Sequence, residues 1–488
     1  MSVTTFSYPK LATLRDVTAF RAHCQGHDIA LPCDDTLLDK TTSPLAHSIV
    51  IAGGSLSNRF AIQPMEGWDA NPNGSPSDQT IRRWQRFGLS GAKLIWGGEA
   101  VAVCPEGRAN PNQLMLNAHT KTGIAHLRET LLKAHKQATG DSDTPFIGLQ
   151  LTHSGRWCRP NRRDFTEPRI AFHHPILDRR QNLAPDYPLL TDSELRALTD
   201  EYIRTALLAY EIGFDFVDIK HCHGYLLHEL LAGHTRAGDY GGAFENRTRF
   251  LRETVQGIRS VAPGLTVGVR LSAFDFVPFR PDSEQGGRGV PDMTEGSLPY
   301  RYGFGVSAEN PVEYDLTETF QLFDLLSELD IPLVNITAGS PYYNPHIQRP
   351  AYYPPSDGYL PPEDPLEGVA RQLEVCRELK RRYPHITLVG SAFTYLQEFL
   401  PYVAQAAVRE KWVDFVGLGR MVLSYPELPS DLLNTGTLQK KLLCRTFSDC
   451  TTAPRNGLIS GCYPLDSYYK TRPEYATLLA LKRTNRRK

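Results

Sequence analysis

The sequence has no uninterrupted apolar run close to the roughly 20 residues that a membrane-spanning helix needs. It has nine cysteines in 488 residues, too few for a disulfide scaffold, and its N-terminus lacks a charged start followed by an apolar stretch. Neither sign of charge prevails, because 53 Lys and Arg residues stand against 54 Asp and Glu residues. These absences argue against a membrane protein, a secreted protein and a nucleic-acid-binding protein, and they predict a cytoplasmic one.

Composition and length point to a folded enzyme. Hydrophobic residues make up 41% of the chain and charged residues 22%, which is close to the average of globular proteins. A chain of 488 residues has room for roughly two to four average domains, or for one barrel enlarged by insertions. We therefore expect an enzyme rather than a disordered protein.

Short strand-like runs alternate with amphipathic, helix-like segments along most of the chain. Such alternation predicts parallel strands joined by right-handed crossovers. Eight strand-like runs favour a closed (β/α)8 TIM barrel of the α/β class, although periodicity alone also allows a doubly wound sheet. The runs are 59–63, 93–96, 146–151, 214–219, 265–271, 332–337, 386–390 and 413–417.

We predict three regions along the chain. Residues 1–48 form an N-terminal extension, residues 49–435 the barrel, and residues 436–488 a C-terminal tail that contains cysteines. Residues 277–310, rich in Gly, Pro and charged side chains, follow the fifth strand and are too long for a simple connection. Insertions after a barrel strand lie on its C-terminal face, so we expect a lid or specificity loop there, with a passive insertion as the alternative.

Polar and glycine residues follow nearly every predicted strand, and the active site of a barrel is assembled from those positions. After the last two strands, Gly390 and Gly419 leave backbone N–H groups open to a phosphate, and Arg420 adds a fork of donors. We therefore expect a phosphorylated ligand at the C-terminal end of the barrel.

Seven stretches, in this order, resemble the old yellow enzyme family of FMN-dependent oxidoreductases, in particular its bacterial branch related to 2,4-dienoyl-CoA reductase and trimethylamine dehydrogenase. They are NRFAIQPMEG, GGEAVAVCPEGRANPNQL, LQLTHSGR, DFVDIKHCHGYLLHELL, GDYGGAFENRTRFLRE, VGVRLSAFD and DFVGLGRMVL, and they span roughly residues 50–425. The succession HGYL, DYGG and ENR is the most specific part. The resemblance implies a TIM barrel that binds FMN, is reduced by NAD(P)H and transfers hydride to an activated alkene such as an enone or enoate.

Carried over to this sequence, the resemblance assigns one set of residues to the flavin. It places Gln150 at the pyrimidine edge of the ring and Arg270 near N1 and C2=O, where a permanent charge would stabilise the reduced flavin. The other positions are Pro64, Met65, Glu66 and Ala100 at the ring, and Gly390, Ser391, Gly419 and Arg420 at the phosphate.

The resemblance also places the catalytic residues after the fourth strand. Tyr225 matches the family's proton donor, a phenol that can protonate the carbon alpha to a carbonyl while hydride reaches the beta carbon. The alternative for Tyr225 is a packed aromatic at a helix start. His223 and Lys220 occupy the two positions that donate hydrogen bonds to the substrate's carbonyl or nitro oxygen.

Two of these positions depart from the family's usual residues. Where histidine is common, Lys220 offers a flexible point charge, so we hypothesise an activating group that is anionic or becomes oxyanionic. An ion pair between Lys220 and Asp218 is the alternative. Glu66 stands where Thr or Cys is frequent. Its carboxylate would lower the flavin's reduction potential, its protonated form would donate a hydrogen bond, or it would partner the substrate or a neighbouring side chain.

The C-terminal cysteines resemble part of a cluster motif. Relatives with a 4Fe–4S cluster use four cysteines after the barrel, spaced C-x2-C-x3-C-x11-C. Here Cys450 and Cys462 keep the eleven-residue gap and Cys444 lies upstream, whereas Thr446 and Phe447 stand near the place of the second cysteine. Because one ligand is missing, we favour a remnant motif without a cluster, no other metal site, and direct reduction of FMN by NAD(P)H.

Two other functions stay open as alternatives. The same flavin barrel could dehydrogenate an amine or a C–H bond and pass electrons to an external acceptor. A metal-dependent barrel hydrolase is the third reading, because His221 and His223 form an H-x-H at a strand end, although the later strand ends offer few further ligands. The expected partner is a small molecule, a homo-oligomer is compatible with the resemblance, and neither nucleic acid nor a membrane is expected.

Overall fold

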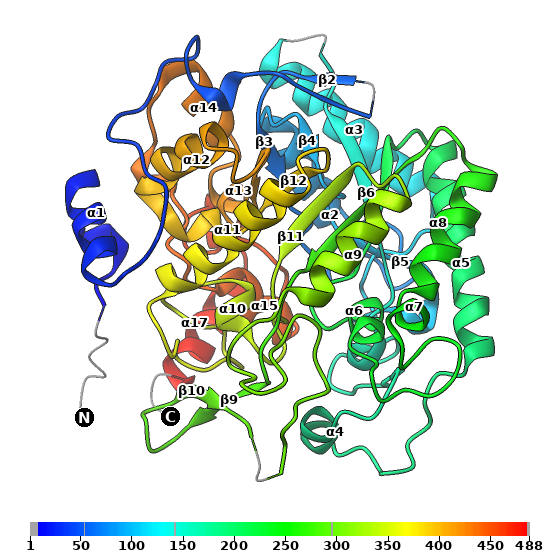
Figure 1. The fold of residues 1–488 in the computed structure, drawn as a ribbon. Coiled ribbons are helices and arrows are strands. Elements are labelled where there is room, and N and C mark those ends of the chain that lie inside the picture. The colour runs from blue at the N-terminus through cyan, green and yellow to red at the C-terminus, as the bar shows by residue number, and fades with distance from the viewer. Residues whose placement is uncertain (1–7, 53, 141–142, 294–295, 486–488) are drawn as a thin grey trace.

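A computed structural model describes residues 8–52, 54–140, 143–293 and 296–485. Eight parallel strands close into a barrel, in which the last strand pairs with the first (Figure 1). Each predicted run overlaps one of them, so the closed (β/α)8 barrel is confirmed. In barrel order they are β3 (Phe60–Ile62), β4 (Leu94–Ile95), β6 (Phe146–Thr152), β7 (Phe216–Ile219), β8 (Thr266–Ser272), β11 (Leu333–Thr337), β12 (Thr387–Gly390) and β13 (Phe415–Leu418). A further short strand, β5 (Ala100–Ala102), pairs with β6 beyond the end of β4.

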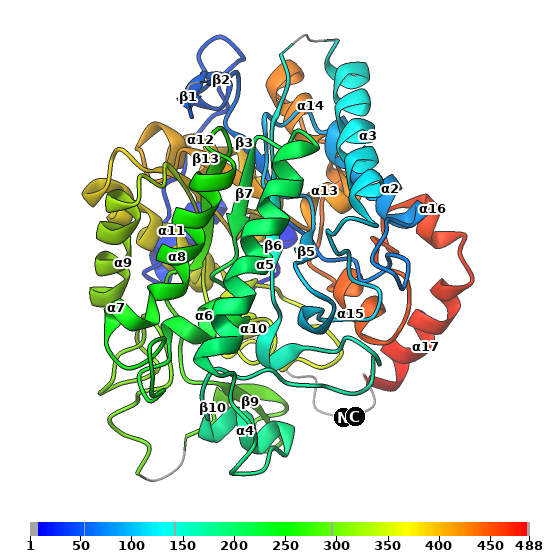
Figure 2. The same ribbon diagram turned by 90° about the vertical axis from the view of Figure 1, so that its right-hand side faces the viewer.

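Helices surround the barrel on its outer side (Figure 2). The longest of them begins with a capping box, in which Thr191 and Glu194 bond each other's backbone N–H groups at 3.2 and 2.8 Å. The helices that follow successive strands are α2 (Asp78–Leu89), α3 (Lys121–Thr139), α5 (Asp192–Glu211), α6 (Leu226–Leu231), α7 (Phe244–Arg247), α8 (Arg249–Val261), α9 (Thr317–Glu328), α10 (Pro345–Gln348), α11 (Pro365–Arg382), α12 (Leu400–Arg409), α13 (Met421–Ser424) and α14 (Leu428–Thr435).

Apolar side chains fill the N-terminal end of the barrel. The rings of Trp96 and Phe216 meet edge to face with centroids 5.2 Å apart. A Cβ on Gly148 would lie 2.2 Å from the Phe216 ring, so only glycine leaves room for that ring. A hairpin of β1 (Ile49–Ile51) and β2 (Gly54–Leu56) adds apolar side chains to the same cluster. This end is closed, and a ligand must enter from the carboxyl ends of the strands.

Two segments outside the barrel pack against its helices. In the N-terminal extension, Phe20 of α1 (Val17–Gly26) stacks on Phe399 with centroids 4.4 Å apart. The insertion after β8 forms an antiparallel hairpin of β9 (Phe279–Asp282) and β10 (Arg288–Pro291).

The insertion is fastened to α4 (Pro175–Gln181), where Asp292 pairs with Arg179 and Arg180 at 2.8 Å each. The described side chains that line the cavity at the carboxyl ends of the strands come from other segments, and a role of the insertion as a lid or specificity loop stays a prediction. The ends of the chain and residues 294–295 of the insertion lie outside the described residues.

The C-terminal tail folds into α15 (Asp449–Arg455), α16 (Ser467–Lys470) and α17 (Glu474–Asn485), which pack on one another, and α16 lies beside α2 (Figure 2). Arg82 of α2 bonds Asp466 at 2.9 Å, and its guanidinium lies 4.2 Å from the ring centroid of Tyr468. The tail is therefore docked on the barrel, while the region boundaries at 48 and 435 stay predictions. Among the described residues, no helix combines the length and apolar character needed to cross a membrane.

Candidate active site

One cavity opens at the carboxyl ends of the barrel strands and encloses about 1260 Å³ of empty space, including its open mouth. The predicted residues that line the cavity are Pro64, Met65, Glu66, Gln150, Lys220, His223, Tyr225, Arg270, Ser391, Gly419, Arg420 and Cys450. Residues predicted at six strand ends thus line one cavity.

Four predicted residues lie behind this lining. Ala100 pairs with Gln150 across β5 and β6, and its carbonyl accepts a bond of 3.1 Å from Gln113 Nε2. Gly390 ends β12, where a Cβ would lie 2.6 Å from Val413. Packing therefore accounts for this glycine. Cys444 and Cys462 are the other two, and neither lines the cavity.

Glu66 ties together three side chains in the cavity. Its Oε1 lies 2.7 Å from Lys220 Nζ, and its Oε2 accepts bonds of 2.9 Å from Trp68 Nε1 and the Tyr225 hydroxyl. Among the alternatives from the sequence, Glu66 is thus the partner of neighbouring side chains. Lys220 is 3% exposed and Glu66 15%, so this ion pair is shielded from water.

The alternative pairing of Lys220 with Asp218 is wrong. Asp218 points into the barrel, where it accepts bonds from Trp96 Nε1 at 2.7 Å, Gln150 Nε2 at 2.5 Å and the Arg270 backbone N–H at 2.6 Å. Burial raises the pKa of this carboxyl, and its bonds to Gln150 and Trp96 counter the rise. Asp218 therefore fixes the side chain of Gln150 and the backbone of Arg270, two of the expected flavin contacts.

Tyr225 is held by its hydroxyl and by its ring. The hydroxyl donates to Glu66 and lies 3.0 Å from the Tyr342 hydroxyl, while Lys220 Nζ lies 3.8 Å from the ring centroid. Burial raises the pKa of Tyr225 well above its usual value, and the charge of Glu66 adds to the rise. Tyr225 is therefore a protonated phenol at neutral pH, as a proton donor must be.

His223 is held in the left-handed backbone region with φ of 67°. Its N–H donates to Ser272 Oγ at 3.0 Å, and its carbonyl accepts from Ser340 Oγ at 2.8 Å. The ring Nε2 lies 3.1 Å from Gln348 Nε2. Burial, followed by the charges of Arg270 and Lys220, holds the pKa of His223 well below its usual value, so the ring is neutral.

His221 and His223 do not face one site. His221 Nδ1 lies 2.8 Å from the Ile219 carbonyl, and the buried ring packs behind the strand end. Within the described part of the chain, no three His, Cys, Asp or Glu side chains gather closely enough to hold a metal ion. The H-x-H pattern is thus explained by the local structure around His221.

Buried neutral histidines make stability depend on pH. Burial lowers the pKa of His221 from 6.5 to about 4, so between these values the unfolded chain binds a proton that the folded chain does not. The free energy of unfolding should therefore decrease as pH falls from 6.5 to 4, by about 1.4 kcal/mol per pH unit for each such group. We expect His221→Asn to flatten this slope in urea titrations at pH 4–7, whereas the exposed His119→Asn should leave it unchanged.

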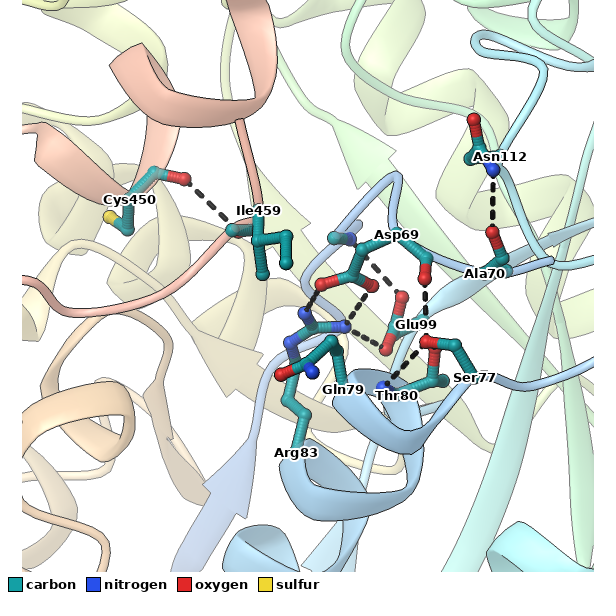
Figure 3. Close-up of polar contacts among 12 residues, drawn as sticks. Asp69, Ala70, Ser77, Gln79, Thr80, Arg83, Glu99, Asn112, Cys450 and Ile459 are labelled. Atoms are coloured by element: carbon teal, nitrogen blue, oxygen red, sulfur yellow. Dashed lines mark hydrogen bonds and ion pairs between the residues drawn. The ribbon is translucent and has the colours of Figure 1, made fainter. Parts of the chain in front are cut away.

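Arg83 is a part of the site that the sequence reading missed. It lies between Asp69 and Glu99, with Nη1 2.5 Å from Glu99 Oε1 and the other nitrogen bonded to Asp69 (Figure 3). Glu99 also accepts a bond of 3.1 Å from the N–H of Gly67, the residue after Glu66. This buried network holds the loop that carries Glu66 and Trp68.

Aromatic and basic residues from distant segments complete the wall of the cavity. Tyr342 stacks on Trp157 with centroids 4.2 Å apart. The residues that the sequence reading missed there are Trp68, Thr337, Tyr342, Gln348, Arg349, Thr451, Arg455 and Ser460. A turn after β11 and the C-terminal tail supply most of them, and neither carries a motif that could have shown the contact.

The tail cysteines contribute one thiol to the cavity. Cys450 lines it, while Cys444 is buried and its backbone N–H donates to Met421 Sδ at 3.3 Å. Burial raises the pKa of Cys444 to about 11 and also raises that of Cys450. Both are therefore thiols at neutral pH, and the reading of a remnant motif stays a prediction.

Comparison with known protein sequences identifies one protein family that this sequence matches. The sequence model of the NADH:flavin oxidoreductase / NADH oxidase family matches residues 45–285. The NADPH dehydrogenase of Bacillus velezensis is 33% identical over 182 residues, which are 36% of this chain and 48% of that protein. The chain thus matches about half the length of this curated relative.

Solved structures share the fold. A complex of 2-naphthoyl-CoA reductase with 2-naphthoyl-CoA has a TM-score of 0.63 at 17% identity, covering 89% of this chain and 58% of that one. The old yellow enzyme homologue from Zymomonas mobilis has a TM-score of 0.55 at 20% identity, covering 81% of this chain and 94% of that one. At such identities the likeness shows the fold alone.

Proposed function

Since this chain belongs to the NADH:flavin oxidoreductase / NADH oxidase family, we propose that it binds FMN, takes hydride from NADH or NADPH and reduces an activated C=C bond of a small molecule. The observation that carries the proposal is the Tyr225 hydroxyl, held between Glu66 and Tyr342 in the cavity that Arg270 and Arg420 also line. The proposal requires a small-molecule substrate, and homo-oligomerisation and a cytoplasmic location stay predictions.

The residues present fit a flavin mononucleotide. Among the described residues, the buried Arg270 Nε and Arg420 Nη1 have no hydrogen-bond partner, as expected of donors aimed at a ligand. A Cβ on Gly419 would meet its nearest neighbour only at 3.9 Å, so the backbone there is open to the cavity. Gln150 and Arg270 would hold the ring, and Ser391, Gly419 and Arg420 the phosphate. When bound, FMN would supply the hydride chemistry.

The chain's own part in the reaction is to orient the substrate and to deliver a proton. Reduction adds a hydride to one alkene carbon and a proton to the other, and Tyr225 would give the proton from its hydroxyl. In the structure this hydroxyl donates to Glu66, so a substrate must compete with Glu66 for the proton. The hydroxyl of Tyr342, 3.0 Å away, would return a proton to the Tyr225 oxygen.

The ion pair of Lys220 with Glu66 changes what the substrate's activating group should be. Because Glu66 neutralises Lys220 at 2.7 Å, a carboxylate placed beside Lys220 would also meet the negative charge of Glu66. We propose instead a neutral carbonyl or nitro group whose oxygen gains charge during reduction. His223 as a neutral donor and Lys220 as a charged one would stabilise that oxygen.

The same contacts support a second candidate, oxidation of an amine with electrons passed to an external acceptor. The ammonium of Lys220 rests between the Tyr225 ring at 3.8 Å and the Glu66 carboxylate, so this part of the cavity stabilises a cation. A substrate ammonium would have to displace Lys220 from this place. Reduction of the bound flavin by amines rather than by NAD(P)H would favour this candidate.

Anaerobic titration tests the proposal directly. The purified protein should show flavin absorbance, or acquire it with added FMN, and this absorbance should bleach with NADH or NADPH. Addition of a cyclic enone should then restore it. A protein that takes up no FMN, or a bound flavin that neither nicotinamide reduces, would contradict the proposal.

Removing either charge of the Glu66–Lys220 pair should shift the reduction potential of the flavin, and the two removals should shift it in opposite directions. Glu66→Gln leaves the Lys220 cation unpaired, which favours the reduced flavin and raises the midpoint potential. Lys220→Met leaves the carboxylate and lowers the potential. The double variant should return close to the wild-type value, and potentiometric dye titration measures all four proteins. Equal potentials in both single variants would place the pair away from the flavin.

A further inference from the structure

Three arginines line the same cavity as the Lys220–Glu66 ion pair. They are Arg349 after α10, Arg420 before α13 and Arg455 at the end of α15, and all three line the cavity. They come from segments far apart in the chain, so tertiary packing alone brings them together.

The partners of these guanidinium groups are mostly neutral. Arg349 donates to Thr451 Oγ1, and Arg420 Nη2 donates to the Pro350 carbonyl at 2.9 Å. Arg455 donates to the Pro341 carbonyl at 3.0 Å and pairs with Asp357, a carboxylate that is 53% exposed. In the contacts described for this wall, three cations thus face one carboxylate, which lies at the surface.

Two nitrogens of this wall are buried without a hydrogen-bond partner among the described residues, Arg349 Nη2 and Arg420 Nη1. An unsatisfied buried donor is unfavourable, and more so when it is charged. Burial, followed by the charges of Arg455 and Arg420, lowers the pKa of Arg349 to about 9. The wall is thus built at an electrostatic cost that an anion would offset.

The phosphate of FMN by itself leaves part of this charge unexplained. Arg420, Ser391 and Gly419 already offer a guanidinium and backbone donors for a phosphate. Arg455 lies toward the substrate side, since its guanidinium is 5.7 Å from the ring centroid of Tyr342, which bonds Tyr225. Arg349 lies near both Arg420 and Arg455, since the charges of both lower its pKa.

We propose that Arg349, with Arg455 and Arg420 beside it, forms a binding site for an oxyanion, a phosphate or a carboxylate. Two sources offer this chemistry: the phosphate of the flavin, or an acidic group remote from the reacting bond of the substrate. The choice of source rests on the proposed function, whereas the anion site itself does not. An acidic substrate would place its charge here and its neutral alkene at Tyr225.

Two pairs of probes separate the sources. FMN and riboflavin differ by the phosphate, and their dissociation constants follow from fluorescence quenching on flavin-free protein. 4-(3-Oxobut-1-enyl)benzoate and 4-(3-oxobut-1-enyl)benzamide share one neutral enone and differ by a charge remote from it, and their constants follow from shifts of the flavin absorbance in the loaded protein. Arg349→Met should weaken the anionic member of one pair by about 10–100-fold and leave its neutral member unchanged. Loss confined to FMN identifies the flavin phosphate, and loss confined to the benzoate identifies the substrate.

A third probe needs no flavin. Inorganic phosphate should raise the unfolding temperature of the wild-type protein more than that of Arg349→Met. Arg349→Lys keeps the charge without the fork and should give an intermediate result, which covers the case that the Met variant does not fold. Arg377→Met, on the outer face of α11 and 53% exposed, is the control and should behave as wild type.

The outcomes judge the two proposals separately. A wild-type protein that binds neither flavin overturns the proposed function, and the response to phosphate still decides the anion site. Unchanged constants for FMN and the benzoate, with an equal response to phosphate in Arg349→Met and wild type, overturn the anion site while the flavin assignment stands.

Discussion

Replacement of Tyr225 by Phe should lower the rate of alkene reduction by about 10²–10⁴-fold, the usual contribution of a positioned general acid. The hydroxyl lies at the one point where Glu66, Tyr342 and the open cavity meet, and its raised pKa keeps the proton on it at neutral pH. Reduction of the flavin by NADH or NADPH needs no proton from Tyr225 and should proceed at close to the wild-type rate. Stopped-flow absorbance measures the two half-reactions separately.

A matched control is Tyr342→Phe, which removes the neighbouring hydroxyl and keeps the ring stacked on Trp157. Because Tyr342 reaches the substrate's proton only through Tyr225, we expect a loss of less than about tenfold in the same half-reaction. An unchanged rate of alkene reduction in Tyr225→Phe would assign the proton to another donor. A loss of flavin reduction as well would indicate damage to the nicotinamide site.

The barrel was predictable because each strand and helix has a residue pattern of its own that can be recognised from neighbouring residues alone. A strand such as Phe216–Ile219 carries its own β-branched and aromatic pattern, and the residues after it fall at the strand end whatever the rest of the chain does. For that reason most of the predicted flavin and catalytic positions line one cavity. Their roles toward a ligand stay predictions.

The pairings between loops were not predictable in the same way. Glu66 and Lys220 are 154 positions apart, whereas Asp218 is a carboxylate only two positions from Lys220, and the alternation of a strand predicts both on one side. In the structure, Asp218 accepts hydrogen bonds from Gln150 and Trp96 in the barrel interior. Lys220 pairs instead with Glu66, in a loop after another strand. Periodicity reports the face of a residue and not its partner across the barrel mouth.

The tail shows the same limit. Its cysteine spacing points to Cys444, Cys450 and Cys462, whereas the tail residue that brings charge to the cavity wall is Arg455, and Thr451 beside it bonds Arg349. Arg349 bonds Thr451 across 102 positions, and no spacing rule links them. The cysteine motif therefore indicates the segment but not its contribution to the site.

Arg83→Met should produce the largest loss of stability, about 3–5 kcal/mol in the free energy of unfolding, because it leaves two buried carboxylates without their cation. Arg83 and Glu99 are each 3% exposed, and the side chain of Asp69 is 5% exposed. Arg86→Met on the same helix is the control, since Arg86 lies 3.7 Å from Asp466, which keeps its closer bond of 2.9 Å to Arg82. It should cost less than about 1 kcal/mol.

The loss should also depend on pH, and the sign follows from Glu99. Burial raises the pKa of Glu99 from 4.5 to about 7 even though Arg83 opposes the rise, so removal of Arg83 raises it further. A raised pKa in the folded state means that the folded chain binds the proton more readily, so stability is lost as pH rises through that value. The deficit of Arg83→Met should therefore be larger at pH 8 than at pH 6 in urea titrations, and Arg83→Met combined with Glu99→Gln should remove most of this difference. A deficit independent of pH would mean that the carboxylate of Glu99 finds water or another donor once Arg83 is gone, and that the loop bearing Glu66 is held by its backbone contacts instead.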